Sequence, residues 1–189
     1  MQALLKQFEK HPVIPAARSP ESVKRAADSN AAVIFLLGGS ILTLPDMIRI
    51  AHEGGKKAFV HLDLAEGLGR DESAVRWCVE RNGADGVIST RPSLLKAASE
   101  LGAITIQRLF LMDSASFEHG KRMLRNTPPD MAEVLPGIAP KAIRELCEAL
   151  EKPVIAGGLV TEAREIALAL QAGAAAVSVG DEQLWNLQL

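Results

Sequence analysis

The chain has 189 residues, 48% of them hydrophobic and 23% charged, and its formal net charge is −2. This length suits one folded domain over residues 1–189, and the charge argues against nucleic-acid binding through bulk charge alone. The longest apolar run, residues 31–37, is far shorter than the roughly 20 residues of a membrane-spanning helix. Because residues 1–10 are charged and amphipathic, with no signal-peptide pattern, we expect a cytoplasmic protein without membrane contact.

Short aliphatic runs alternate with helical patterns from one end of the chain to the other. Each run is expected to be a strand, and the runs begin near Val13, Ala32, Ala58, Gly86, Ile104, Met131, Val154 and Ala175. Their separation of about 23 residues suits βα units joined by short loops. The pattern therefore predicts parallel strands connected by helices.

Capping residues and glycines mark the expected helix ends. Ser19-Pro20-Glu21 offers a capping oxygen, a preset φ and an acidic first turn, and Thr43 and Thr161 begin similar segments. Three glycines follow helical runs and are expected in the left-handed conformation that ends a helix, namely Gly54, Gly83 and Gly173.

Eight parallel strands either close into a barrel or spread into a doubly wound sheet. Even spacing, and the lack of Gly-x-Gly-x-x-Gly after the first strand, favour the barrel. The sequence thus predicts an α/β fold, a compact (β/α)8 TIM-like barrel. Because such barrels typically have about 250 residues, one irregular strand is compatible with this prediction. Residues 1–10 then either close the barrel floor or pair with another chain in a homo-oligomer.

Two glycine-containing segments provide the most specific sign of a binding site. Gly157-Gly158 follow the seventh expected strand, and Ser178 and Gly180 belong to the eighth and its end. Glycines there let backbone N–H groups approach an anion closely, so we expect a phosphate site at the carboxyl ends of the strands. The alternative is that these glycines only form tight turns, and Asp181 would repel an anion if it pointed inward.

Acidic, basic and imidazole side chains follow other strands. His61 and Asp63 share one face of a strand and, with Glu133, resemble an acid–base set of a barrel isomerase or lyase acting on a small phosphorylated substrate. Alternatively they orient ligand hydroxyls or neutralise three arginines at strand ends, Arg18, Arg91 and Arg108. No lysine is expected at a strand end, so Schiff-base chemistry has no nucleophile.

Basic residues are densest at Lys121, Arg122 and Arg125. Such a cluster is either a solvated helix face or a nucleic-acid contact. The two cysteines, Cys78 and Cys147, have neither a paired spacing nor nearby histidines, so we expect no metal site and no disulfide framework.

Six segments in combination resemble the glycerol-3-phosphate-responsive antiterminators, the GlpP-type regulators of bacterial glycerol-use operons. They are PVIPAAR (12–18), HLDL (61–64) with Gly67, GVISTR (86–91), IQRLFLMDS (106–114), EVLPG (133–137) and AGG (156–158). The resemblance runs nearly end to end. The chain departs from the family pattern at Val179-Gly180-Asp181 and at Gly38-Gly39-Ser40.

The resemblance implies a barrel without catalytic activity or cofactor that binds glycerol 3-phosphate as its effector. It also implies action on leader mRNA, promoting transcriptional read-through and message stability. We expect the phosphate at Gly157-Gly158 and Gly180 and the hydroxyls near His61, Asp63, Gln107 and Glu133. The full set of expected ligand-binding residues is Arg18, His61, Asp63, Arg91, Gln107, Arg108, Glu133, Gly157, Gly158, Ser178 and Gly180. The basic cluster at residues 121–125 is the candidate RNA contact.

Overall fold

The structure is a computed structural model that describes residues 1–187. Its strands are β1 (Val13–Ala17), β2 (Val33–Leu36), β3 (Lys57–His61), β4 (Gly86–Ser89), β5 (Ile104–Phe110), β6 (Met131–Leu135), β7 (Val154–Gly157) and β8 (Ala176–Val179). Its α-helices are α1 (Gln2–Lys10), α2 (Pro20–Ala27), α3 (Leu44–Glu53), α4 (Glu72–Arg76), α5 (Pro92–Glu100), α6 (Ser114–Asn126), α7 (Pro140–Ala149) and α8 (Ala163–Gln171). Shorter helical segments are η1 (Leu62–Leu64), η2 (Trp77–Arg81) and η3 (Glu182–Leu184).

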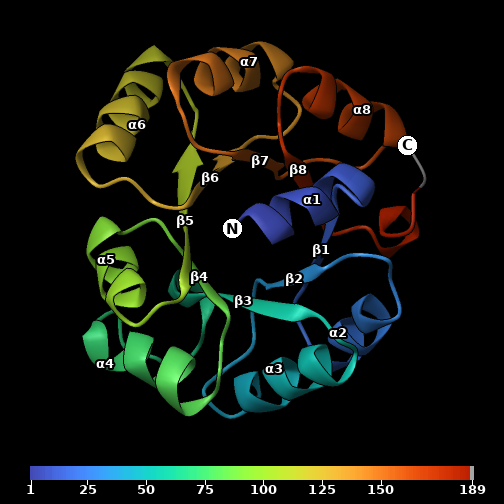
Figure 1. The fold of residues 1–189 in the computed structure, drawn as a ribbon, viewed down its shortest axis with the longest axis vertical. Coiled ribbons are helices and arrows are strands. Elements are labelled where there is room, and N and C mark those ends of the chain that lie inside the picture. The colour runs from blue at the N-terminus through green and yellow to red at the C-terminus, as the bar shows by residue number, and fades with distance from the viewer. Residues whose placement is uncertain (188–189) are drawn as a thin grey trace.

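The eight strands form a closed parallel barrel in sequence order, surrounded by helices α2 to α8 (Figure 1). The barrel closes where β1 pairs with β8, with Val13 opposite Val177. Each strand begins within one residue of its predicted position and pairs with both neighbours, so none is missing or irregular. The predicted (β/α)8 TIM-like barrel is confirmed.

Apolar residues line both faces of the strands because helices cover one face and the barrel interior the other. In β2, Phe35 faces the interior and stacks on Phe59 with ring centroids 6.0 Å apart. Ile34 and Leu36 belong instead to the cluster between strands and helices. This packing on both sides explains why the strands are continuous apolar runs rather than alternating patterns.

Helix α1 closes the amino-terminal end of the barrel. In Figure 1 it lies across the barrel axis, and Leu4 and Phe8 are buried in the interior apolar cluster, 6% and 2% exposed. The cluster they complete includes Ile14, Phe59 and Ile106. Of the two interpretations of residues 1–10, the structure supports the closed floor, and a homo-oligomer stays a prediction.

Replacing Phe8 with alanine is expected to cost about 3–5 kcal/mol of unfolding free energy, because it leaves a cavity in the barrel floor. Urea unfolding followed by circular dichroism measures the loss, with the exposed neighbour changed in Glu9→Ala as the control. A loss below about 1 kcal/mol for Phe8→Ala would mean that α1 contributes little to the barrel core.

Helix ends follow the predicted caps at some positions and not at others. Ser19 caps α2 by accepting from the Ser22 amide at 3.3 Å, whereas Thr43 precedes α3 without making a cap bond. Gly83 and Gly173 have the predicted left-handed φ, but the prediction for Gly54 is wrong: its φ is −78°. Gly55 takes the left-handed conformation instead. Gly54 is needed for packing, since a Cβ there would lie 2.6 Å from that of Ala27.

None of the helices in residues 1–187 is long and apolar enough to cross a membrane.

Candidate functional site

The alternation of side chains along the strands decides which polar groups face the barrel interior. In β5, Ile106 packs in the interior cluster, so Arg108 two residues further on faces the interior as well. The same alternation directs Glu133 of β6 and Ser178 of β8 inward at the carboxyl end of the barrel. This end, where parallel barrels bind ligands, therefore has a polar top layer.

Glu133 is the fixed centre of this layer. It is fully buried and accepts two hydrogen bonds, from Arg108 Nε to Oε2 and from Ser178 Oγ to Oε1, each at 2.7 Å. Gly157 makes room for the carboxylate, since a Cβ there would lie 2.6 Å from Glu133 Oε1. The structure thus brings four of the predicted site residues into one network, in which Gly157 has a steric role.

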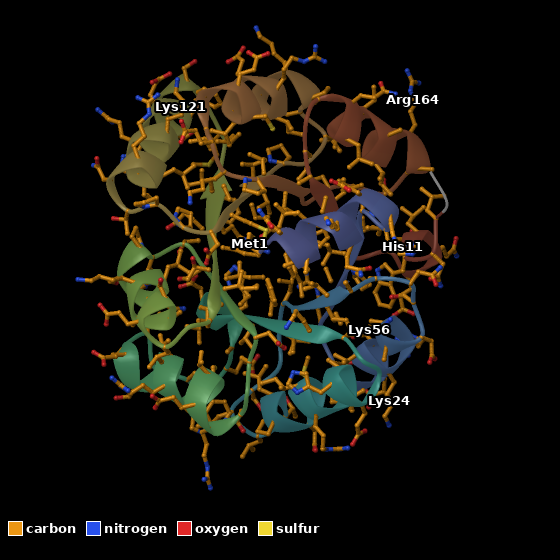
Figure 2. The ribbon with its side chains drawn as sticks, in the orientation of Figure 1. Met1, His11, Lys24, Lys56, Lys121 and Arg164 are labelled. Atoms are coloured by element: carbon orange, nitrogen blue, oxygen red, sulfur yellow. The ribbon has the colours of Figure 1, made fainter. Side chains whose placement is uncertain are left out.

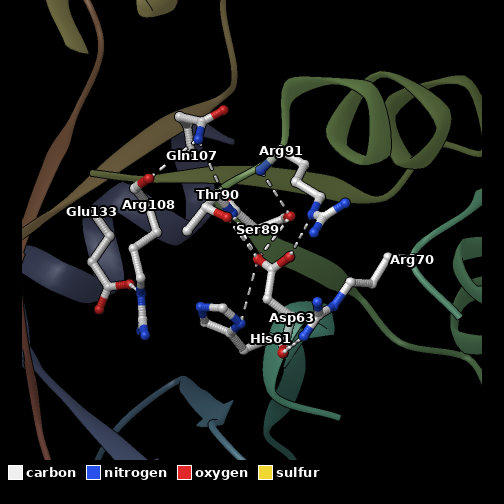
Figure 3. Close-up of polar contacts among 9 residues, drawn as sticks. All are labelled: His61, Asp63, Arg70, Ser89, Thr90, Arg91, Gln107, Arg108 and Glu133. Carbon is white, nitrogen blue, oxygen red and sulfur yellow. Dashed lines mark hydrogen bonds and ion pairs between the residues drawn. The ribbon is translucent and has the colours of Figure 1, made fainter. Parts of the chain in front are cut away.

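His61 lies beside this network with no hydrogen-bond partner. Its ring is 2% exposed, both nitrogens are unpaired, and Nδ1 is 3.9 Å from Asp63 Oδ2, too far for a hydrogen bond (Figure 3). Burial and the positive charge of Arg108 lower the pKa of His61 to about 4. At neutral pH, His61 is therefore an uncharged imidazole with one donor and one acceptor.

Asp63 lies in η1 and is held by the β4–α5 connection. Its Oδ2 accepts from Ser89 Oγ at 2.9 Å and from the Thr90 amide at 2.7 Å. Its Oδ1 has no hydrogen bond and lies 3.5 Å from Nε of the half-exposed Arg91. Asp63 and Arg91 therefore partly neutralise each other at the rim, one of the alternatives that the sequence left open.

Gln107 points away from the barrel interior. It lies between Ile106 and Arg108, both of which face inward, so its side chain takes the opposite face of β5 (Figure 3). Its Nε2 donates to the carbonyl oxygens of Ser89 and Arg108, each at 3.2 Å. The structure therefore does not bring Gln107 together with the other expected ligand-binding residues.

A pocket of about 270 Å³ opens at the carboxyl ends of the strands. Its size suits a small ligand, since drug-sized ligands occupy pockets of about 300–1,000 Å³. Predicted residues that line it are Arg18, Arg108, Glu133, Gly158, Ser178 and Gly180. The sequence pointed to Asp181 only as a residue that would repel an anion and to Thr161 only as a helix start, and both line the pocket. The other lining residues are Ala16, Leu37, Leu135, Leu159 and Val160. The apolar ones carry no chemical signal, and the Gly157-Gly158 pair was the only pointer to the loop at 159–161.

The loops after β7 and β8 use their glycines differently. Gly158 has φ +76°, and a Cβ there would lie 2.8 Å from Leu135 Cδ2, so the fold itself requires this glycine. The next residue, Leu159, also has a positive φ, of 61°. Around Gly180, by contrast, a Cβ would meet no atom within 4 Å, so glycine there leaves open space beside the pocket.

Backbone donors in these loops are available to a ligand. Within residues 1–187, the amides of Leu159, Val160 and Gly180 donate to no protein acceptor. The carboxylate of Asp181 accepts from the Gln183 amide at 3.0 Å, which caps η3. With Arg18 and Arg108 in the same pocket, the site can bind an anion through both backbone and guanidinium donors.

The basic cluster lies on α6, outside the barrel. Lys121 lies on α6 (Figure 2), and its Nζ is 4.8 Å from the Phe117 ring centroid and paired with Glu118. Arg122 and Arg125 are exposed. A hollow of about 440 Å³ beside Lys121, between α6 and α7, is larger than the mouth pocket. No unpaired buried polar side chain of the described residues lines it, so the mouth is the stronger site.

No group of three or more His, Cys, Asp or Glu side chains in the described part of the chain is arranged to hold a metal ion.

Fold and site define a parallel (β/α)8 barrel with a small pocket at its mouth, lined by Arg18 and Arg108. A family model described as "Glycerol-3-phosphate responsive antiterminator" matches residues 13–185, and the chain belongs to this family. It is 37% identical over 184 residues to the uncharacterized protein YgcP of Escherichia coli (strain K12), covering 97% of this chain and 96% of the relative.

Two solved structures are similar over nearly their whole length. The glycerol uptake operon antiterminator regulatory protein from Listeria monocytogenes is 31% identical with a TM-score of 0.90, covering 94% of this chain and 96% of that one. A glycerol uptake operon antiterminator-related protein from Thermotoga maritima is 33% identical with a TM-score of 0.81, covering 92% and 96%. Barrel enzymes match at 20% identity or less, and that likeness shows the fold alone.

Proposed function

We propose that this protein is a transcription antiterminator that binds glycerol 3-phosphate and acts on the leader mRNA of glycerol-metabolism genes. The bound form promotes read-through and stabilises the message, and the barrel catalyses no reaction. The observation that supports this most is the family match over residues 13–185, together with a small pocket at the barrel mouth that Arg18 and Arg108 line.

In this proposal the phosphate group binds at the loops after β7 and β8. The free amides of Leu159 and Gly180 donate to its oxygens, and Arg18 and Arg108 supply positive charge. The glycerol end extends toward the interior, where His61 lies. Arg122 and Arg125, exposed on α6, are the proposed RNA contacts, because exposed guanidinium groups suit phosphate backbones.

The alternative, an isomerase or lyase, has weaker support from the polar groups themselves. Both oxygens of Glu133 accept hydrogen bonds from Arg108 and Ser178, and these bonds favour the charged form, which makes Glu133 a weaker base. A pKa of about 4 places His61 well away from the neutral range that suits general acid–base catalysis. No lysine lies at the carboxyl end of a described strand.

Millimolar glycerol 3-phosphate is expected to raise the melting temperature, because a ligand that binds only the folded state stabilises it by about 2.7 kcal/mol at one hundred times Kd. Gly180→Val is expected to remove this response without lowering the stability of the unliganded protein, since the added side chain meets open space. Differential scanning fluorimetry measures both, with Ala115→Val on exposed α6 as the control. An unchanged rise in melting temperature for Gly180→Val would show that the phosphate does not bind beside Gly180.

RNA action is tested by a gel shift with the leader transcript, with and without glycerol 3-phosphate, together with transcription through the leader terminator in vitro. We expect ligand-dependent binding and increased read-through. Absence of RNA binding both with and without glycerol 3-phosphate would overturn the proposal that this protein is an antiterminator. Turnover of a phosphorylated triose or polyol, followed by NMR, would favour the enzyme instead.

A further inference from the structure

Exposed apolar side chains gather around the mouth of the barrel. Nine large ones are exposed in residues 1–187, of which Phe110 ends β5 and six others lie in connections that follow strands. The six are Ile41, Leu42, Leu64, Met112, Ile138 and Leu159. Together with Phe110 they form what we call the mouth ring, in which Leu42 is 84% and Met112 85% exposed. Because monomeric proteins rarely expose large apolar patches, the mouth ring indicates a surface that a partner covers.

The chemistry of the mouth ring favours a protein partner over RNA. Six of its seven side chains are Leu, Ile or Met, whereas RNA-binding surfaces stack bases on aromatic rings and carry an excess of basic residues. After β1, β4 and β8 the described connections contribute no member of the ring, and Arg18, Arg91 and Asp181 are exposed there instead. Asp113, beside Met112 after β5, is exposed as well. An apolar surface flanked by charges of both signs suits a protein interface.

The order of the strands makes these charges self-complementary. Two barrels can meet mouth to mouth across a two-fold axis that passes between β8 and β1 and between β4 and β5 (Figure 1). The end of β1 then lies opposite β8 of the second copy, and β4 lies opposite β5. Arg18 of one copy is thus placed opposite Asp181 of the other, and Arg91 opposite Asp113. No other two-fold axis through an eight-stranded mouth pairs both arginines with both aspartates.

The same axis also pairs apolar residues. It places β2 opposite β7 and β3 opposite β6, so Leu42 lies opposite Leu159 and Leu64 opposite Ile138. In a two-fold interface every such pairing occurs twice, which makes one self-complementary patch sufficient for a dimer. Leu159 and Asp181 also line the mouth pocket, so the second copy covers that pocket as well.

We infer that the partner of the mouth ring is a second copy of this chain, bound mouth to mouth across this two-fold axis. The inference goes beyond the proposed function and does not depend on which ligand the pocket binds. It assigns Leu42 and Leu159 to the centre of the recognition, because both are largely exposed in the single chain, 84% and 70%, and face each other in the dimer.

Analytical ultracentrifugation of the full chain between about 1 and 100 µM, without ligand, tests the dimer. We expect the wild-type protein to sediment at twice the mass of one chain. Leu42→Lys and Leu159→Glu are each expected to raise the dissociation constant at least about tenfold, because each places a charge against an apolar side chain of the partner. In the double variant Leu42→Lys/Leu159→Glu opposite charges face each other, and association is expected to recover. Leu168→Glu, exposed on α8 outside the mouth ring, is the control without effect.

Three results would overturn the mouth-to-mouth dimer. One is a wild-type protein that stays monomeric throughout this range, and another is a dimer that neither single variant weakens. The third is a double variant that associates no better than the single ones, since this would contradict the two-fold pairing. A monomeric wild type whose binding to leader RNA in a gel shift falls in Met112→Glu would assign the mouth ring to RNA instead. Both substituted positions are exposed in the single chain, so folding is expected to be retained, as circular dichroism checks.

Discussion

Replacing Glu133 with alanine is expected to lower the unfolding free energy by about 3–5 kcal/mol. The substitution removes the carboxylate that accepts from both Arg108 and Ser178 in the buried top layer of the barrel. Arg108 cannot lose its charge, and it is 93% buried with Nη2 already unpaired, so its guanidinium would be left without compensation. Urea unfolding at neutral pH measures the loss.

Two further variants separate charge from packing at Glu133. Glu133→Gln keeps an acceptor oxygen but not the charge, so its loss is expected to be smaller than that of Glu133→Ala. The double variant Arg108→Met/Glu133→Leu removes the ion pair altogether and is expected to regain most of the stability, since apolar replacements of buried pairs are often neutral. It is also expected to lose its response to glycerol 3-phosphate. A Glu133→Ala variant as stable as wild type would contradict the expected cost of leaving the buried Arg108 charge without its partner.

The sequence predicts the barrel well because each βα unit carries its own local signals. Aliphatic runs bounded by polar residues mark the start of every strand to within one residue, and Ser19 and the glycines at 83 and 173 mark helix ends. The left-handed conformation predicted for Gly54 is wrong, because the sequence does not distinguish a glycine needed for close packing, here against Ala27, from one needed for a positive φ. The sequence does not decide whether residues 1–10 close the barrel floor or pair with another chain, since an amphipathic helix can cover either surface.

The binding site is less predictable because its geometry depends on contacts between distant strands. Glu133 meets Arg108 and Ser178 from strands 25 and 45 residues away in sequence. Gln107 and Arg108 are adjacent, so only one of them faces the interior. Because both faces of a barrel strand carry apolar residues, the sequence pattern does not show which of the two it is. The glycines at the ends of β7 and β8 identify the barrel mouth. Their different roles, Gly157 making room for Glu133 and Gly180 leaving open space, are visible only in the structure.

Lowering the pH from about 6.5 to about 4 is expected to remove roughly 3 kcal/mol of stability through His61 alone. Its pKa is about 4 in the folded protein and 6.5 in the unfolded chain, because burial and the facing Arg108 disfavour the charged ring more than the facing Asp63 favours it. Between these values the unfolded chain binds a proton that the folded protein does not. Stability therefore rises with pH across this window and is lost as pH falls through it.

His61→Gln isolates this contribution, since glutamine does not titrate and fills a similar volume. The difference in unfolding free energy between wild type and variant, measured by urea denaturation at several pH values, is expected to change by roughly 3 kcal/mol between pH 7 and pH 4. Other titrating groups affect both proteins alike and cancel. Parallel stability curves would contradict a buried His61 that is neutral at pH 7, whereas an NMR titration midpoint near 4 would agree with it.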